Sequence, residues 1–227
     1  MDAPDWVRSL LNIDSPTLAN AIEKLNVRNR ATGFASRAMR QLTAELGVMC
    51  GYAVTAEAIT MTAEPSDRRD DVRMYLEVAA AIERSPKPAV VVIQEFGPHP
   101  EFSAHVGQVM ATLFKRFGAI GVVSDSAVRD LPEVRAMGVH LFAPGTVASH
   151  ANFHIQRVQA PVCVCGLTVQ PGDLLHGDVN GLISVPVEGR QRLLEMVEQV
   201  RAKEKVVLEY LSGAAVTMDG VFDRMTH

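Results

Sequence analysis

Apolar residues recur at two spacings along the chain, one typical of buried strands and the other typical of helices. Short β-branched runs at Ala89–Ile93 and Ile120–Val123 are bounded by proline, glycine or small polar residues, and each predicts a buried strand. Residues 104–117 lie between them and carry apolar side chains at helical spacing: Val106, Val109, Met110, Leu113 and Phe114. The order strand, helix, strand predicts a βαβ unit, whose parallel strands are joined by a right-handed crossover in nearly all known proteins.

The two strands of this unit must end at the same edge of the sheet. The loop over 97–107 and the loop over 124–130 are therefore expected to face one crevice. Ligands in open α/β sheets bind beside the carboxyl ends of the strands. The second loop ends in Arg129 and Asp130, so a guanidinium and a carboxylate are predicted where an α/β protein keeps its site. These two residues form the candidate active centre.

Helices are predicted at both ends of the chain and before the βαβ unit. Ser15-Pro16 is typical of an N-cap followed by proline at the first helical position. Ser66 is expected to cap a helix that extends to about Glu83. A last helix is expected over about 188–211, where apolar residues recur at helical spacing among many charges.

Further strands are expected where residues alternate or are β-branched: one or two strands over 48–61, one over 139–143, two over 156–169 around Pro161, and one over 182–185. Clusters of Gly, Asn and Asp at 171–173 and 177–181 predict turns. This succession of elements predicts an α/β protein with N- and C-terminal helices, in which the βαβ unit carries the site.

Composition narrows the class of protein. With 227 residues the chain can bury one substantial core, so we expect a single domain with a helical extension over 188–213. The net charge of −4 argues against a nucleic-acid-binding surface, which is usually basic. No apolar run approaches the roughly 20 residues of a membrane span, and the N-terminus lacks the features of a signal peptide. Three cysteines, Cys50, Cys163 and Cys165, fit a reduced, cytoplasmic protein.

Two interpretations of Arg129 and Asp130 fit the spacing about equally well. In the structural one, Asp130 caps a helix that begins at Leu131, Glu133 completes a capping box, and Arg129 is a surface cation. In the functional one, Arg129 binds a carboxylate through two parallel donors, and Asp130 is a hard oxygen ligand for Mg²⁺ or Mn²⁺. A helix that begins near Gly107, in the same crevice, would offer free N–H groups to a second anionic group.

The remaining motifs are weaker. His150 and His154 have the four-residue spacing of zinc-binding helices, but they lack the glutamate of HExxH, so a zinc site is not favoured. We expect these two residues and His176 to be ordinary loop histidines. Cys163 and Cys165 point to one face of a strand, which favours core packing over a metal site. No glycine-rich motif opens a helix after a strand, so the sequence gives no support for a dinucleotide or S-adenosylmethionine site.

Three segments together resemble the RraA-like family, which includes 4-hydroxy-4-methyl-2-oxoglutarate aldolases, oxaloacetate decarboxylases and the regulator of ribonuclease activity A. They are Gly107-Gln108, residues 118–130 (Gly-Ala-Ile-Gly-Val-Val-Ser-Asp-Ser-Ala-Val-Arg-Asp) and residues 171–181 (Pro-Gly-Asp-Leu-Leu-His-Gly-Asp-Val-Asn-Gly). The resemblance covers about residues 15–190, which would then form the core of the domain.

The resemblance implies a compact α/β/β swivelling-type fold that assembles as a homotrimer or a dimer of trimers. It also implies a metal-dependent lyase that breaks the C3–C4 bond of a small 2-oxo-dicarboxylate by way of a pyruvate enolate. Arg129 would bind the 2-oxo acid, and Asp130 would hold Mg²⁺ or Mn²⁺. Backbone groups of four consecutive residues would cradle the pyruvate carboxylate: Gly107, Gln108, Val109 and Met110.

This chain departs from the family pattern at two positions. Gln108 stands where the family usually has Asp or Glu, and Ser126 stands where it has Gly. Gln108 is expected at the catalytic centre, but an amide cannot take a proton as a carboxylate can. Decarboxylation needs only an electron sink, so we hypothesise that it survives Gln108 better than aldol cleavage does. The alternative is a non-catalytic regulatory or binding protein on the same scaffold.

Overall fold

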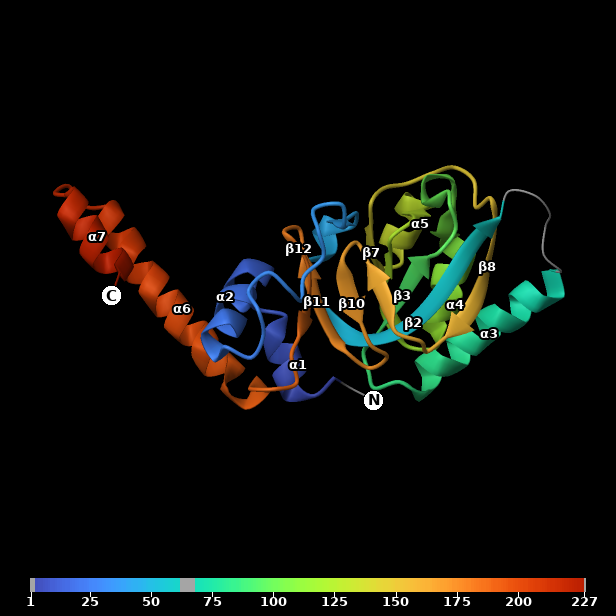
Figure 1. Ribbon diagram of the computed structural model, residues 1–227, viewed down its shortest axis with the longest axis horizontal. Coiled ribbons are helices and arrows are strands. Elements are labelled where there is room, and N and C mark those ends of the chain that lie inside the picture. The colour runs from blue at the N-terminus through green and yellow to red at the C-terminus, as the bar shows by residue number, and fades with distance from the viewer. Residues whose placement is uncertain (1–2, 62–67, 227) are drawn as a thin grey trace. The chain divides into compact units, whose positions relative to one another are not determined.

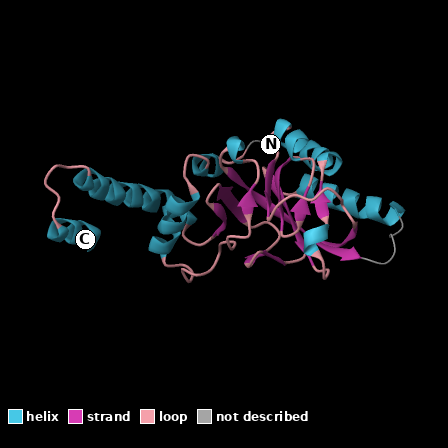
Figure 2. Ribbon diagram, turned by 90° about the horizontal axis from the view of Figure 1, so that it is seen from above, coloured by secondary structure: helices cyan, strands magenta, loops and turns pink. Residues whose placement is uncertain are grey.

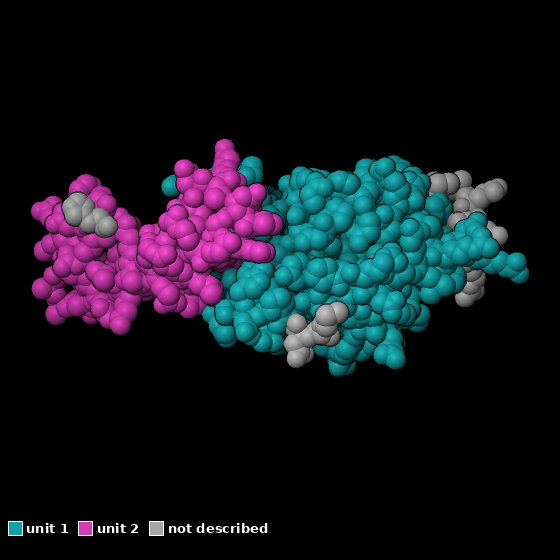
Figure 3. All heavy atoms as spheres, turned by 90° about the horizontal axis from the view of Figure 1, so that it is seen from below, with its two compact units in different colours: residues 1–15, 30–185 teal, residues 16–29, 186–227 magenta. Residues whose placement is uncertain are grey.

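The computed structural model describes residues 3–61 and 68–226 (Figure 1). It separates into two compact units: unit 1 consists of residues 1–15 and 30–185, and unit 2 consists of residues 16–29 and 186–227 (Figure 3). The single domain expected from the sequence, with a core over 15–190 and an extension over 188–213, stays a prediction. The cap predicted at Ser66 lies outside the described residues.

Unit 1 is built around a mixed sheet, which has eight strands in the part of the chain that the structure describes (Figure 2). Its strands are β1 (Arg40–Gln41), β2 (Met49–Met61), β3 (Ala89–Glu95), β5 (Ala119–Ser124), β7 (His140–Ala143), β8 (Asn152–Val158), β11 (Leu174–Asp178) and β12 (Gly181–Val185). They lie in the order β1-β7-β5-β3-β2-β11-β12, and β8 also pairs with β2. The neighbours β7, β5, β3 and β2 are parallel, whereas the outer pairings are antiparallel.

Both faces of the sheet are covered, which explains why β3 reads as an unbroken apolar run. Val91 and Ile93 face one core with residues of three helices, α3 (Arg68–Arg84), α4 (Gln108–Arg116) and α5 (Leu131–Ala136). Val90 and Val92 face a second core, which the hairpin of β9 (Val162–Val164) and β10 (Leu167–Val169) closes. The predicted α/β fold is confirmed by this arrangement.

The predicted βαβ unit is confirmed, because β3 and β5 pair in parallel with α4 between them in the chain. The predicted start of its helix at residue 104 is wrong. Ala104–Val106 forms a short strand, β4, which pairs in parallel with β6 (Ala127–Val128), and the helix begins only at Gln108. The reason is tertiary: the apolar residues of β4 are buried by pairing with β6, which lies about 20 residues further along the chain.

Two other predictions, for strands and turns of unit 1, were wrong. Residues 156–169 contribute to three strands instead of two, β8, β9 and β10, because the chain turns back between β9 and β10 at Cys165 and Gly166, both with positive φ. The turn expected over 177–181 is shorter, because Gly177 and Asp178 end β11 and only two residues connect it to β12. The strand β11 itself was not predicted from the sequence. It is half of an antiparallel hairpin whose register pairs Asp178 with Gly181.

The remaining segments of unit 1 are a short helix, α1 (Asp5–Leu10), and 3₁₀ turns at Ala44–Leu46 and Pro100–Phe102. The helix α2 (Ser15–Leu25) begins one residue before the predicted position, because Ser15 was expected to be its N-cap. Ser15 is its first helical residue, and the Ser15 hydroxyl hydrogen-bonds to His176 Nδ1 across 3.1 Å. The Ser15 N–H donates to Asp178 Oδ2 at 2.8 Å.

Unit 2 contains most of α2 together with two C-terminal helices, α6 (Arg190–Leu211) and α7 (Met218–Thr226). The long helix α6 matches the prediction over 188–211, whereas α7 was not predicted. The chain turns back after α6, and Tyr210 fixes the turn: its hydroxyl accepts the Thr217 N–H, and the Arg224 guanidinium lies 3.8 Å above its ring. Of the helices in the described ranges, none combines the length and the apolar character needed to cross a membrane.

Candidate functional site

The ladder of β4 and β6 brings the two predicted loops together. Arg129 follows β6 directly, and its N–H donates to the carbonyl of Val106 at the end of β4 across 3.0 Å. Gly107, the next residue, is the N-cap of α4. Arg129 and Asp130 therefore lie beside the start of α4, as the βαβ topology predicted.

Gly107 is required for this close approach. A Cβ atom added at position 107 would lie 2.5 Å from Asp130 Oδ2 and 3.0 Å from both Cγ and Nε of Arg129. Its backbone φ of −124° suits any residue, so space and not conformation selects glycine. Any larger side chain would push the carboxylate and the guanidinium away from the helix start.

Asp130 caps a helix, but not the predicted one. Its Oδ2 accepts the N–H of Gln108 at 2.9 Å, at the start of α4. It makes no side-chain cap for α5, and its backbone adopts the left-handed conformation with φ of 55°. The capping box predicted from Asp130 to Glu133 is therefore wrong, because the carboxylate turns back to the helix before its own.

One oxygen of Asp130 remains available. Oδ1 makes no hydrogen bond to any residue that the structure describes, and 39% of the side chain is exposed. Arg129 Nε lies 3.8 Å from the other oxygen, Oδ2, and 37% of its side chain is exposed. The Arg129 guanidinium and the Oδ1 atom of Asp130 are thus both accessible from solvent.

The other predicted site residues follow on the first turn of α4. Gln108 and Val109 are exposed, Val109 to 79%, and Met110 is half-buried. The first N–H groups of a helix have no partner within the helix, and Asp130 uses that of Gln108. The N–H groups at 109 and 110 are therefore the ones suited to receive a carboxylate.

A cavity of about 300 Å³ opens beside this turn. Its lining comes from α3, β4, the start of α4, the residue after β6, the loop before β8 and β8 itself: Asp71, Tyr75, Ala104, His105, Gly107, Met110, Arg129, His150, Ala151, Asn152 and Phe153. Arg129 also borders a second hollow of about 350 Å³, together with Asp130, the start of α5 and residues 146–148. Small anionic molecules would meet Arg129 from either side.

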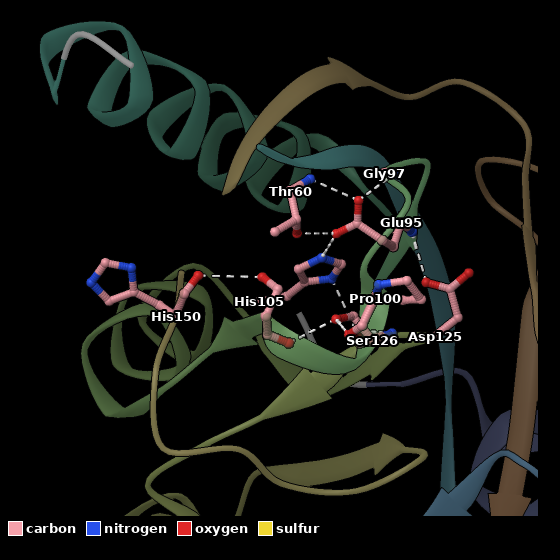
Figure 4. Close-up of polar contacts among 10 residues, drawn as sticks. Thr60, Glu95, Gly97, Pro100, His105, Asp125, Ser126 and His150 are labelled. Atoms are coloured by element: carbon pink, nitrogen blue, oxygen red, sulfur yellow. Dashed lines mark hydrogen bonds and ion pairs between the residues drawn. The ribbon is translucent and has the colours of Figure 1, made fainter. Parts of the chain in front are cut away.

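A buried polar network, which was not predicted from the sequence, connects His105 of β4 to Glu95 and Ser124 (Figure 4). His105 Nε2 lies 2.7 Å from Glu95 Oε2, and its Nδ1 lies 3.0 Å from Ser124 Oγ. Glu95 also accepts hydrogen bonds from Thr60 and Gly97. Burial alone would raise the pKa of Glu95, but the hydrogen bonds from His105, Thr60 and Gly97 lower it.

Asp125 lies next to this network and has the most perturbed carboxyl group near the site. Its Oδ1 accepts the N–H of Glu95 at 2.7 Å. Burial raises the pKa of Asp125 to about 7 against this hydrogen bond, and the charge of Glu95 raises it further. Polar residues at the carboxyl ends of two buried strands, at 94–95 and 124–125, were the signal that could have revealed the network.

Ser126, one of the two departures from the family pattern, has a structural role. It is buried, and its hydroxyl lies 2.5 Å from the carbonyl of Pro100 and 2.7 Å from that of Ser103. It thereby holds the loop that precedes β4. A glycine at this position could not make either contact.

The histidines and cysteines set aside from the sequence are distributed over unit 1. His154 lies on β8 and His176 is buried on β11, so the prediction of loop histidines is wrong for these two. His150 lies in the loop before β8, and it does not share a helix face with His154. Cys165 is half-buried against the second core, as expected, but Cys163 is exposed, so the prediction that both pack in the core is wrong for Cys163. Side chains alternate along β9, and Val162 and Val164 face the core, so Cys163 between them faces outward.

The donor set suits a hard cation bound through one carboxylate. In residues 3–61 and 68–226, no three His, Cys, Asp or Glu side chains are grouped to hold a metal. Mg²⁺ and Mn²⁺ commonly take one or two protein carboxylates and fill the remaining positions with water and substrate oxygens. Asp130, with Oδ1 free and Oδ2 fixed by Gln108, is fitted to be such a single ligand.

The chain resembles known proteins in sequence and in fold. The family model described as "RraA-like: Aldolase/RraA" matches residues 15–184. A protein of Halalkalibacterium halodurans that carries the provisional name 4-hydroxy-4-methyl-2-oxoglutarate aldolase is 25% identical over 125 residues, which are 55% of this chain and 60% of that protein. The chain thus spans less than two thirds of that relative's length.

Solved structures share the fold over nearly the whole chain. A protein from Pseudomonas syringae pv. tomato superposes with a TM-score of 0.70 at 23% identity, covering 100% of this chain and 95% of that one. Streptomyces coelicolor RraAS2, described as an unusual member of the RNase ES inhibitor RraA protein family, superposes with a TM-score of 0.67 at 24% identity. That match covers 93% of this chain and 98% of the other.

Proposed function

We propose, from the premise that this chain belongs to the RraA-like family, that it is a divalent-metal-dependent lyase for a small 2-oxo-dicarboxylate. The bond broken is C3–C4, either in decarboxylation of an oxaloacetate-type substrate or in retro-aldol cleavage of a 4-hydroxy-4-methyl-2-oxoglutarate-type substrate. The observation that carries the proposal is that Arg129 and the start of α4 line one cavity, while Asp130, beside Arg129, accepts a hydrogen bond from the first N–H of that helix.

Each residue has a role that follows from its position. Arg129 pairs with the carboxylate and the 2-oxo group of the substrate, because a guanidinium donates two parallel hydrogen bonds. The N–H groups of Val109 and Met110 receive the carboxylate at the positive end of α4. Gln108 can orient a water molecule through its amide but cannot remove a proton.

Asp130 completes the arrangement as the single protein ligand of Mg²⁺ or Mn²⁺. Such an ion supplies positive charge to the 2-oxo oxygen, on which negative charge grows as the C3–C4 bond breaks. The hydrogen bond from the Gln108 N–H fixes one carboxylate oxygen and so aims the other at the crevice. We further propose, with the family, a cytoplasmic homotrimer or dimer of trimers.

The test is the loss of oxaloacetate in the presence of Mg²⁺, with EDTA, and in the Arg129→Ala variant. Free metal also accelerates this decarboxylation, so a protein-free Mg²⁺ sample sets the baseline. Loss of an Arg–carboxylate contact is expected to lower kcat/KM by about 100-fold, since such contacts contribute about 1.5–3 kcal/mol or more. Arg201→Ala removes an arginine from α6 and serves as the matched control. A wild-type rate equal to that of free metal would contradict the proposal.

A second candidate, a non-catalytic regulatory or binding protein on the same scaffold, is favoured by Gln108. The amide at this position removes the acid or base that the family usually carries. A thermal shift separates the two candidates: Mg²⁺ with oxalate or pyruvate raises the Tm of an enzyme that binds them, by mass action. A protein whose site has lost this chemistry would not respond.

A further inference from the structure

We propose that His150 is the general base of this lyase and removes the hydroxyl proton of 4-hydroxy-2-oxo acids during retro-aldol cleavage. This inference rests on the proposed lyase function. Gln108 cannot remove a proton, and the inference assigns this step to His150, in the loop before β8. His150 lines the cavity together with Arg129, Gly107 and Met110, and it is exposed.

The hydrogen bonding of His150 fixes which ring nitrogen can act as a base. Nδ1 lies 2.5 Å from the carbonyl oxygen of Ala151. A carbonyl oxygen only accepts hydrogen bonds, so Nδ1 must carry the hydrogen in this contact. The lone pair of the neutral ring is then on Nε2, which has no hydrogen-bond partner among the described residues. A neutral imidazole held in this tautomer is the form that a general base requires.

The loop that carries His150 is tied to the strand that carries the site. Ser103 Oγ donates to the His150 carbonyl at 3.3 Å (Figure 4). The Ala104 N–H donates to the Ser149 carbonyl at 3.2 Å. Ser149 Oγ accepts the N–H of Ala151 at 3.0 Å. Ala151 has a positive φ of 49°, a conformation that residues other than glycine rarely adopt. The turn is thus held in a specific shape against β4, and His150 stays at the cavity wall.

Other titratable groups of the cavity lack the properties of a base. His105 uses both ring nitrogens, one toward Glu95 and one toward Ser124. Burial, followed by the charge of Asp71, raises the pKa of Tyr75 to about 12, so its hydroxyl stays protonated at neutral pH. Arg129 is a permanent cation.

Asp71 is the remaining competitor. It lines the cavity from α3, and its Oδ1 lies 4.0 Å from His154 Nδ1, so this carboxylate already faces an imidazole. Arg129, a permanent cation, lines the same cavity. His150 is the stronger candidate, because its Nε2 has no hydrogen-bond partner among the described residues. The experiment therefore also includes a variant of Asp71.

The proposed step balances in atoms and electrons. The Nε2 lone pair of His150 takes the proton of the C4 hydroxyl. The O–H electron pair becomes the new carbonyl bond at C4, and the C3–C4 pair moves to C3 to give the enolate of pyruvate. Protonation at C3, by the imidazolium or by water, completes the turnover. One molecule of 4-hydroxy-4-methyl-2-oxoglutarate thus yields two molecules of pyruvate, and no oxidant or reductant is consumed.

Decarboxylation of oxaloacetate provides an internal reference, because its substrate has no C4 hydroxyl proton to remove. Loss of a general base therefore slows one reaction and spares the other. A variant that merely disturbed the fold or Arg129 would slow both. The ratio of the two kcat values is a readout that a purely structural role of His150 would leave unchanged.

The experiment measures pyruvate formation from both substrates at saturating Mg²⁺ in wild-type protein, His150→Gln and Asp71→Asn. His99→Gln removes an exposed histidine outside the cavity and is the matched control. We expect His150→Gln to lower kcat for aldol cleavage by about 100-fold or more, the usual contribution of a general base, and kcat for decarboxylation by less than about 3-fold. We also expect the acidic limb of the aldol pH profile to disappear, and free imidazole to restore part of the activity of His150→Ala.

Four results would overturn the assignment. Equal losses of both activities in His150→Gln would make the residue structural, and a selective aldol loss in Asp71→Asn would transfer the role to Asp71. Two further results would reject His150 as the base without rejecting the proposed lyase function. One is unchanged aldol cleavage in His150→Gln, and the other is wild-type protein that decarboxylates oxaloacetate but does not catalyse aldol cleavage. Absence of both activities in wild-type protein would instead reject the proposed function, on which the base depends.

Discussion

Asp125 makes the stability of this protein depend on pH in a direction opposite to that of a carboxylate whose pKa is lowered by folding. Its pKa rises from 3.8 to about 7 in the folded protein, chiefly because the side chain is buried. Between about pH 4 and pH 7 the folded protein holds a proton on Asp125 that the unfolded chain has released. Stability from this group is therefore greatest near pH 4, falls as the pH rises, and becomes constant above about pH 7.

The size of this contribution to the free energy of unfolding follows from the change in pKa. One pKa unit corresponds to about 1.4 kcal/mol, so a rise from 3.8 to about 7 limits the contribution to about 4 kcal/mol. Asp125→Asn removes the charge but keeps the Oδ1 acceptor for the Glu95 N–H at 2.7 Å. The variant should therefore be more stable than wild-type protein at pH 8, by up to about 4 kcal/mol, and the difference should shrink toward zero near pH 4.

The assay is urea unfolding of both proteins at several pH values from 4.5 to 8.5, followed by subtraction of the two free energies of unfolding. Subtraction cancels the other titrating groups, including His140 and His176, whose pKa values are lowered by burial and whose effect has the opposite sign. Asp219→Asn, on α7, controls for the change in net charge. A free-energy difference between wild type and Asp125→Asn that stays constant with pH would refute the reasoning.

Two further predictions concern the start of α4. Gly107→Ala should destabilise the fold by about 1–3 kcal/mol and abolish lyase activity, because the added Cβ would lie 2.5 Å from Asp130 Oδ2. Urea unfolding measures the loss of stability, and the oxaloacetate assay measures the loss of activity. Full activity of the variant would contradict the predicted clash. Gln108→Glu should raise the aldol turnover by supplying a carboxylate, and more so in the His150→Gln background, where it should replace the missing base. No gain in either background, with Mg²⁺ still bound, would show that position 108 does not face the reacting hydroxyl.

The sequence by itself determined the elements whose signals are local. The β-branched runs of β3 and β5 and the apolar spacing of α4 identified the βαβ unit, because a strand buried on both faces must be apolar throughout. The parallel pairing of these strands then required the loops that end in Gly107 and in Asp130 to meet at one edge. Arg129 and Asp130 could therefore be named as candidates before any coordinates were known.

Only the tertiary structure decided how those candidates are held. Asp130 caps α4 instead of α5, because the β4–β6 ladder brings residues 22 positions apart into hydrogen-bonding distance. The Glu95–His105–Ser124 network joins the ends of three strands, and no local pattern specifies which strand ends become neighbours. The same is true of His150, whose loop reaches the cavity only because it is hydrogen-bonded to β4. Spacing along the chain predicts faces and ends of elements, whereas the register of the sheet decides which side chains share a site.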